Sequence, residues 1–201
     1  FGWVVEYDPY DPASKAVKRT ALGRIKHEAA TCVLNHDGRA VVYTGDDDEF
    51  EFVYKFVSAK AWDPKDPASA RTLLDEGTLY VARFADDETL EWLPLVHGTG
   101  ALTKETGFES QADVLIEART AATLLGATPM DRPEDVETNP ATGLVYVMLT
   151  NNNLRKAEQL DAPNPRKKNR HGHVLELAPP KDARGARDHA ATKFAWKVFL
   201  L

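Results

Sequence analysis

The chain has 201 residues, of which 43% are hydrophobic and 28% charged, and its formal net charge is −6. This length suffices for one substantial hydrophobic core. No run reaches the ~20 apolar residues of a membrane-spanning helix, so we expect no membrane partner. The negative charge repels phosphate backbones, which disfavours nucleic acid as a partner. The basic residues within 166–170 lie among Pro and Asn residues and indicate a solvated loop.

In chain order, short runs rich in β-branched and aromatic residues predict that most of the chain is β-strand. The expected strands lie near residues 1–8, 17–25, 29–34, 39–44, 52–57, 78–84, 144–149, 173–177 and 193–200. The single cysteine, Cys32, excludes a disulfide within the chain. Because it lies in an apolar run, we expect it to be a small core side chain.

One segment breaks the strand pattern, because apolar residues recur at helical spacing between residues 110 and 125. Ser110 is a candidate N-cap, and Gly126 follows the last apolar position. The sequence therefore predicts one inserted helix near 110–125.

Two internal repeats suggest how the strands are organised. Residues 2–9 (GWVVEYDP) resemble residues 172–179 (GHVLELAP), and residues 27–47 resemble 133–152. In the second pair, each copy contains a glutamate, then a strand, a turn with a glycine, and a second strand that contains a tyrosine. Repeated units of four strands are typical of β-propeller blades.

These repeats predict an all-β, mainly antiparallel fold, an incomplete β-propeller forming a single domain. Its units would be a half blade at 1–25, a blade at 27–92, an insertion with the helix at 93–133 and a blade at 134–201. Because closed propellers have ~4–8 blades, about two and a half blades cannot close a ring, so we expect the chain to be an internal fragment. An ordinary antiparallel sandwich is the alternative.

Glu28 and Glu134 occupy the same position in the repeat, at the entrance to the innermost strand of a blade. Side chains there reach the mouth of the central channel, so both carboxylates are candidate metal ligands. Hard oxygen ligands suit calcium or ferric iron. The alternative for either residue is an ordinary exposed loop carboxylate.

Arg132 precedes Glu134 by two residues, across Pro133. Proline biases the residue before it towards an extended conformation, in which the side chains of 132 and 134 point to the same side. An arginine beside a metal-binding carboxylate is suited to binding a phosphate group. A structural ion pair with Asp131 or Asp135 is the alternative.

Two further residues are weaker metal-site candidates. His27 adjoins Glu28, but neighbouring side chains of a strand face opposite ways, so His27 is expected to be packed or to support a ligand. Asp46 belongs to the acidic run 46–51, which lacks the spacing of an EF-hand loop and predicts a solvated turn. From the end of its strand, Asp46 could still reach the channel.

The chain resembles the PhoX alkaline phosphatases over nearly its whole length. The resemblance rests on residues 1–6 (FGWVVE), 26–28 (KHE), 42–47 (VYTGDD), 54–57 (YKFV), 77–84 (GTLYVARF), 130–134 (MDRPE) and 149–152 (LTNN). It implies a propeller exported by the twin-arginine route to the periplasm or secreted, which hydrolyses phosphate monoesters with ferric iron and calcium.

Carried over by motif, the resemblance makes Glu28 and Glu134 metal ligands and Arg132 the phosphate-binding residue. The family's iron-binding cysteine belongs to a motif that the chain lacks, so Cys32 does not replace it. We expect the fragment alone to be inactive and to bind calcium only or no metal. Two alternatives stay open, a calcium-dependent lactonase or esterase propeller and a non-catalytic binding propeller. Exposed strand edges suggest self-association.

Overall fold

The computed structural model describes all 201 residues and is mostly β-structure, as the sequence predicts. Its strands are β1 (Val5–Glu6), β2 (Val17–Lys18), β3 (His27–Leu34), β4 (Arg39–Asp46), β5 (Val53–Ala61), β6 (Gly77–Phe84), β7 (Thr89–Pro94), β8 (Pro133–Thr138), β9 (Val145–Leu149), β10 (His173–Ala178) and β11 (Lys193–Leu200). Its helices are α1 (Gln111–Ile116) and α2 (Ala118–Leu124), with short 3₁₀ turns at Thr20–Leu22, Pro67–Thr72, Lys104–Thr106 and Ala157–Gln159.

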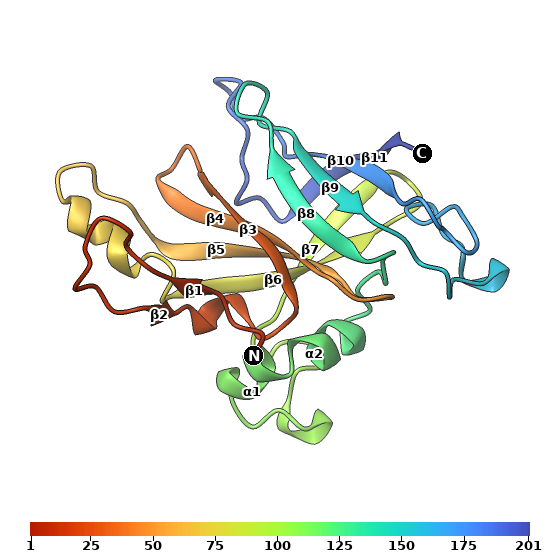
Figure 1. Cartoon of the computed structure of the whole chain (residues 1–201), viewed down its shortest axis with the longest axis horizontal. Helices are drawn as coiled ribbons and strands as arrows, with labels where there is room; N and C mark the ends of the chain where they lie inside the picture. Colours follow the sequence, from red (N-terminus) through yellow and green to blue (C-terminus); the bar gives the residue numbers. More distant parts are fainter.

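Nine strands form one antiparallel sheet in the order β3-β4-β5-β6-β7-β11-β10-β9-β8, while β1 and β2 form a separate pair. The sheet has two halves, β3–β6 and β8–β11, which are joined because β7 pairs with both β6 and β11. It curls until its two end strands, β3 and β8, lie beside each other (Figure 1). There the hydroxyl of Thr31 donates to the carboxylate of Glu137 at 3.2 Å.

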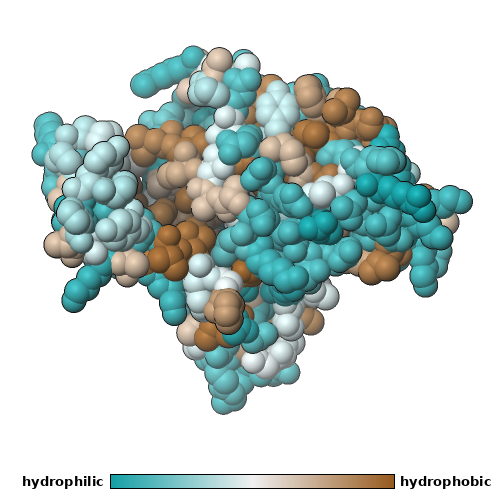
Figure 2. Space-filling model, viewed as in Figure 1, coloured by the Kyte–Doolittle hydropathy of each residue, from teal (hydrophilic) through white to brown (hydrophobic).

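Successive side chains of a strand point to opposite faces of the sheet, so the buried side chains form two cores, one on each face. In β5, Tyr54 and Phe56 join the core that packs against α1 and α2, whereas Val53 and Val57 join the core between the two halves of the sheet. Each core contains 17 buried residues. In the view of Figure 2, apolar surface shows beside β3–β5 and again at the upper right, near the C-terminal end of β11.

The predicted single helix is instead two short helices that meet at Glu117. Ser110 does cap the first one, since its side chain accepts a hydrogen bond from the amide of Asp113. The break has a tertiary cause: the carbonyl oxygens of Leu115 and Ile116 accept hydrogen bonds from the amide and guanidinium of Arg24, at 2.8 and 3.0 Å. The prediction of helical structure near 110–125 was therefore correct, but the prediction of one continuous helix was wrong.

Three other expectations need correction. The strand expected over 17–25 ends at Lys18, because a 3₁₀ turn follows and Gly23 adopts a φ of 79°. No strand was expected at 89–94, yet β7 there joins the two halves of the sheet. Cys32 is exposed, because it lies on the face of end strand β3 that also exposes Glu28 and Leu34.

Candidate functional site

The candidate site forms where the turn between β4 and β5 lies against the segment that enters β8. The amide of Phe50 donates to the carbonyl of Met130, and the amide of Met130 donates to the carbonyl of Glu51, both at 2.9 Å. Glu49 and Asp131 pair as an isolated bridge. These backbone bonds bring the acidic turn and Arg132 together, although they are far apart in the sequence.

Arg132 lies between two carboxylates. Its Nη2 atom is 2.8 Å from Oδ1 of Asp47 and 3.2 Å from Oε1 of Glu134. All three side chains are between 21% and 32% exposed, so the group is accessible. Because both contacts use Nη2, Nε and Nη1 are available to bind an anion. Arg132 therefore pairs with Asp47 and Glu134, and not with Asp131 or Asp135.

The backbone of Arg132 differs from the prediction, because its φ is 54° and the residue is left-handed. The expected extended conformation is wrong, and simple alternation does not explain why Arg132 meets Glu134. The side chains meet because the backbone turns at this point, immediately before the proline.

Glu28 and Glu134 flank Gly45. Glu28 pairs with Gly45 across β3 and β4. A Cβ atom at Gly45 would lie 2.2 Å from the carbonyl oxygen of Pro133 and 2.3 Å from that of Glu134. Glycine is thus needed for β8 to lie against β4. Each glutamate is the second residue of its strand and lies at a register shift, but Glu28 is the last paired residue before the shift in β3, whereas Glu134 lies within the shift in β8 and has no partner in β9.

His27 lies next to Glu28 but makes different contacts. Its Nδ1 is 3.0 Å from the hydroxyl of Thr44, and its Nε2 is 3.0 Å from the carbonyl oxygen of Gly23. Burial lowers the pKa of His27, which favours the neutral ring. Both ring nitrogens are occupied within the protein, as expected for a packed residue.

Asp46 is fully buried and faces α2. Its Oδ2 atom accepts a hydrogen bond from Nε of Arg119 at 2.7 Å, and its Oδ1 atom contacts Nη2 of Arg119 and accepts from the amide of Lys26. Hydrogen bonding to Asp46 raises the pKa of Arg119. Since Arg119 and Lys26 engage both oxygens, Asp46 supports the turn at a position away from Arg132.

The rest of the acidic run is half-buried, so the solvated turn predicted there is wrong. Arg119 also approaches Asp48 at 3.4 Å and Glu51 at 3.5 Å. Burial raises the pKa of Glu51 to about 7. The run is thus shared between two arginines, with Asp46, Asp48 and Glu51 facing Arg119 and Asp47 facing Arg132.

Comparison with known proteins identifies the family of the chain. The family model of alkaline phosphatase PhoX matches residues 1–201. The chain belongs to the PhoX alkaline phosphatase family. A solved structure, Pseudomonas fluorescens PhoX in complex with vanadate, a transition state analogue, is 47% identical to it with a TM-score of 0.90. That match covers 98% of this chain and 35% of the other. No curated protein matches the chain.

The family resemblance and the all-β partial propeller expected from the sequence are thereby confirmed. The alternative of an ordinary sandwich is wrong, because the structural match extends over nearly the whole chain. The chain spans about a third of the length of the PhoX structure it matches, since the match covers 35% of it. No helix here combines the length and apolar character needed to cross a bilayer.

Asp47 is the residue of the candidate site that sequence reasoning missed. In a run of four consecutive acidic residues, nothing local indicates which one faces the arginine. No group of three or more His, Cys, Asp or Glu side chains is arranged in the structure to hold a metal ion. A surface hollow of about 1090 Å³ lies at the ends of β9–β11, and neither glutamate nor Arg132 lines it.

Proposed function

We propose that the chain is part of a metal-dependent phosphomonoesterase in which Arg132 binds the phosphate of the substrate. The observation that carries the proposal is the accessible guanidinium of Arg132, placed between the carboxylates of Asp47 and Glu134 at 2.8 and 3.2 Å. An arginine with free N–H groups donates two parallel hydrogen bonds to phosphate oxygens. The family model and the vanadate complex of the related PhoX support the phosphatase part of this proposal.

We propose Glu28 and Glu134 as metal ligands, with calcium and ferric iron as the metals. The donor set fits such ions, because Glu28, Glu134 and Asp47 all supply hard carboxylate oxygens, and Oδ1 of Asp47 is buried. Bound metal ions would supply positive charge that polarises the phosphoryl oxygens. Arg132 would orient the phosphate and neutralise the charge that develops on it during transfer.

We infer that these residues form part of a site completed by other blades of a longer protein. The chain spans 35% of the related structure, and no three potential ligands among its own residues are arranged around a common point. The 201 residues alone would therefore be inactive and would bind calcium only or no metal. Export to the periplasm or beyond, and self-association through exposed strand edges, stay predictions of the same proposal.

The decisive experiment compares the full-length protein with its Arg132→Ala and Glu134→Gln variants by phosphomonoester assay and metal analysis. We expect Arg132→Ala to lower kcat/KM by about 100-fold, the loss of ~3 kcal/mol typical of one lost charge-stabilising donor, with metal content unchanged. We expect Glu134→Gln to lower the calcium or iron content. Full activity in Arg132→Ala would refute the phosphate assignment, and ester hydrolysis without phosphatase activity would favour the lactonase alternative.

A further inference from the structure

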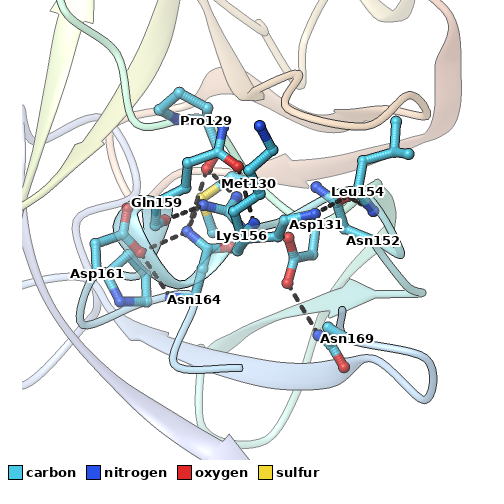
Figure 3. A network of polar contacts seen from close by, with 12 residues as sticks. Pro129, Met130, Asp131, Asn152, Leu154, Lys156, Gln159, Asp161, Asn164 and Asn169 are labelled. Carbon is cyan, nitrogen blue, oxygen red and sulfur yellow. Dashed lines mark hydrogen bonds and ion pairs between the residues drawn. The ribbon is translucent and has the colours of Figure 1, made fainter. Parts of the chain in front are cut away.

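A network of polar contacts, many of them buried, joins Pro129 and Asp131, just before Arg132 in the chain, to the loop that follows β9 (Figure 3). Its centre is Arg155, which lies in the loop that follows β9. The side chain of Arg155 is 2% exposed, and that of its partner Asp131 is 0% exposed. Nε of Arg155 lies 2.5 Å from Oδ1 of Asp131. Nη1 donates to the carbonyl of Gln159 and Nη2 to that of Pro129, both at 2.7 Å. Every nitrogen of the guanidinium thus has a partner.

The second oxygen of Asp131 is also bonded. Nδ2 of Asn169 donates to Oδ2 of Asp131 at 3.0 Å and lies 3.0 Å from Nδ1 of His173. Nε2 of His173 donates to the carbonyl of Pro163 at 2.7 Å, and burial lowers the pKa of the ring. A neutral His173 accepts at Nδ1 from Asn169, so each of these bonds has one donor and one acceptor. A buried ion pair is tolerated when its remaining hydrogen-bonding atoms are satisfied in this way.

The network acts on the residue next to Asp131. Arg132 has a φ of 54°, a left-handed conformation that costs free energy for a residue with a Cβ, and it precedes a proline, which favours an extended backbone. Such a conformation persists only where the surrounding structure enforces it. Here the side chain of Asp131 is fixed by Arg155 and Asn169, and the carbonyl of Arg132 accepts from the amide of Thr150 at 3.1 Å.

We propose that Arg155 is a positioning residue for Arg132. By fixing Asp131 and the carbonyl of Pro129 at once, Arg155 holds the backbone turn that delivers the guanidinium of Arg132 to the gap between Asp47 and Glu134. It touches no substrate and acts through Asp131. The inference rests on the proposed function, in which Arg132 binds phosphate.

The test uses the full-length protein, with vanadate as the probe of phosphate binding. Arg155→Lys keeps a positive charge beside Asp131 but cannot reach three acceptors as the planar guanidinium does. We expect Arg155→Lys to raise the vanadate inhibition constant about tenfold and to leave the metal content unchanged. Tenfold is the lower end of the loss observed when a residue that supports a ligand is removed. Asn169→Ala, which leaves the ion pair intact, should act in the same direction with a smaller effect.

Arg19→Lys is the matched control. Arg19 is 3% exposed, and its guanidinium has a similar set of partners, with Nε 2.7 Å from Glu6, Nη1 2.5 Å from Asp75 and Nη2 donating to the carbonyl of Arg71 at 2.8 Å. It joins β1 and β2 to the 3₁₀ turn near 67–72, away from Arg132. Both lysine variants should lower the melting temperature, but only Arg155→Lys should weaken vanadate binding.

The double variant Arg132→Ala with Arg155→Lys separates the outcomes. If Arg155 acts through Arg132, the double variant binds vanadate no more weakly than Arg132→Ala. An additional loss as large as that of Arg155→Lys alone overturns the positioning role, and so does an Arg155→Lys variant that matches Arg19→Lys. If Arg132→Ala itself leaves vanadate inhibition unchanged, the proposed function has failed instead.

Discussion

Gly45→Ala tests whether close approach of β4 and β8 builds the site. The added Cβ would lie 2.2 Å from the carbonyl oxygen of Pro133, where ordinary contact begins at 3.4 Å. The obstacle is backbone, so β8 must retreat by roughly 1 Å, an overpacking that costs about 3 kcal/mol at the upper end of the usual range. Alanine also lowers the conformational entropy of the unfolded chain, which stabilises the folded chain by at most ~1 kcal/mol. We therefore expect a net loss of about 2 kcal/mol.

Urea denaturation of the purified chain measures this loss, and vanadate inhibition of the full-length protein measures the effect on the site. Because Arg132 and Glu134 move with β8, the inhibition constant should also rise. Gly98→Ala is the control, since a Cβ there meets nothing within 4 Å and its φ of 80° leaves only a backbone cost. A Gly45→Ala chain as stable as the unsubstituted chain, with unchanged vanadate inhibition, would refute the reasoning.

Three further predictions concern stability in urea. Burial lowers the pKa of His189 from 6.5 to about 4. The unfolded chain therefore binds this proton at a higher pH than the folded chain, and the free energy of unfolding should fall by ~3 kcal/mol as the pH falls from 6.5 to about 4. His189→Asn should abolish this part of the pH dependence, and an unchanged pH dependence would contradict the assignment. Arg119→Ala leaves the buried Asp46 unpaired and should cost about 3 kcal/mol, whereas retained stability would show that the pair contributes little. Ser110→Ala removes an N-cap and should cost about 1 kcal/mol, while Thr123→Ala in α2, the control, should cost nothing.

The sequence predicts structure well where neighbouring residues decide it. The runs 144–149 and 173–177 are short and rich in strand-forming residues, which identified them as strands without the rest of the fold, and the structure has β9 and β10 there. Ser110 has the residue type and the position of an N-cap, and the structure uses it as one. In both cases the information lies within a few residues of the feature.

The same reasoning fails where a distant residue decides. Arg24 interrupts the helix at Glu117 from far away in the chain, and nothing between 110 and 125 signals it. Arg132 is left-handed although proline favours the opposite, because Asp131 beside it is held by Arg155 and Asn169. Local rules give the preference of the isolated segment, which tertiary contacts then override.

The internal repeat is the sequence feature that led to Glu28 and Glu134. Because Glu28 and Glu134 begin equivalent strands, contact between β3 and β8 brings the same end of both strands to one edge of the molecule. The repeat does not single out Asp47, which stands at its end within an acidic run that the second copy lacks, and Arg155 lies beyond it. The strands therefore set the position of the candidate site, while the loops set which side chains line it, so substitutions in the loops should alter the binding of an anion before they alter the fold.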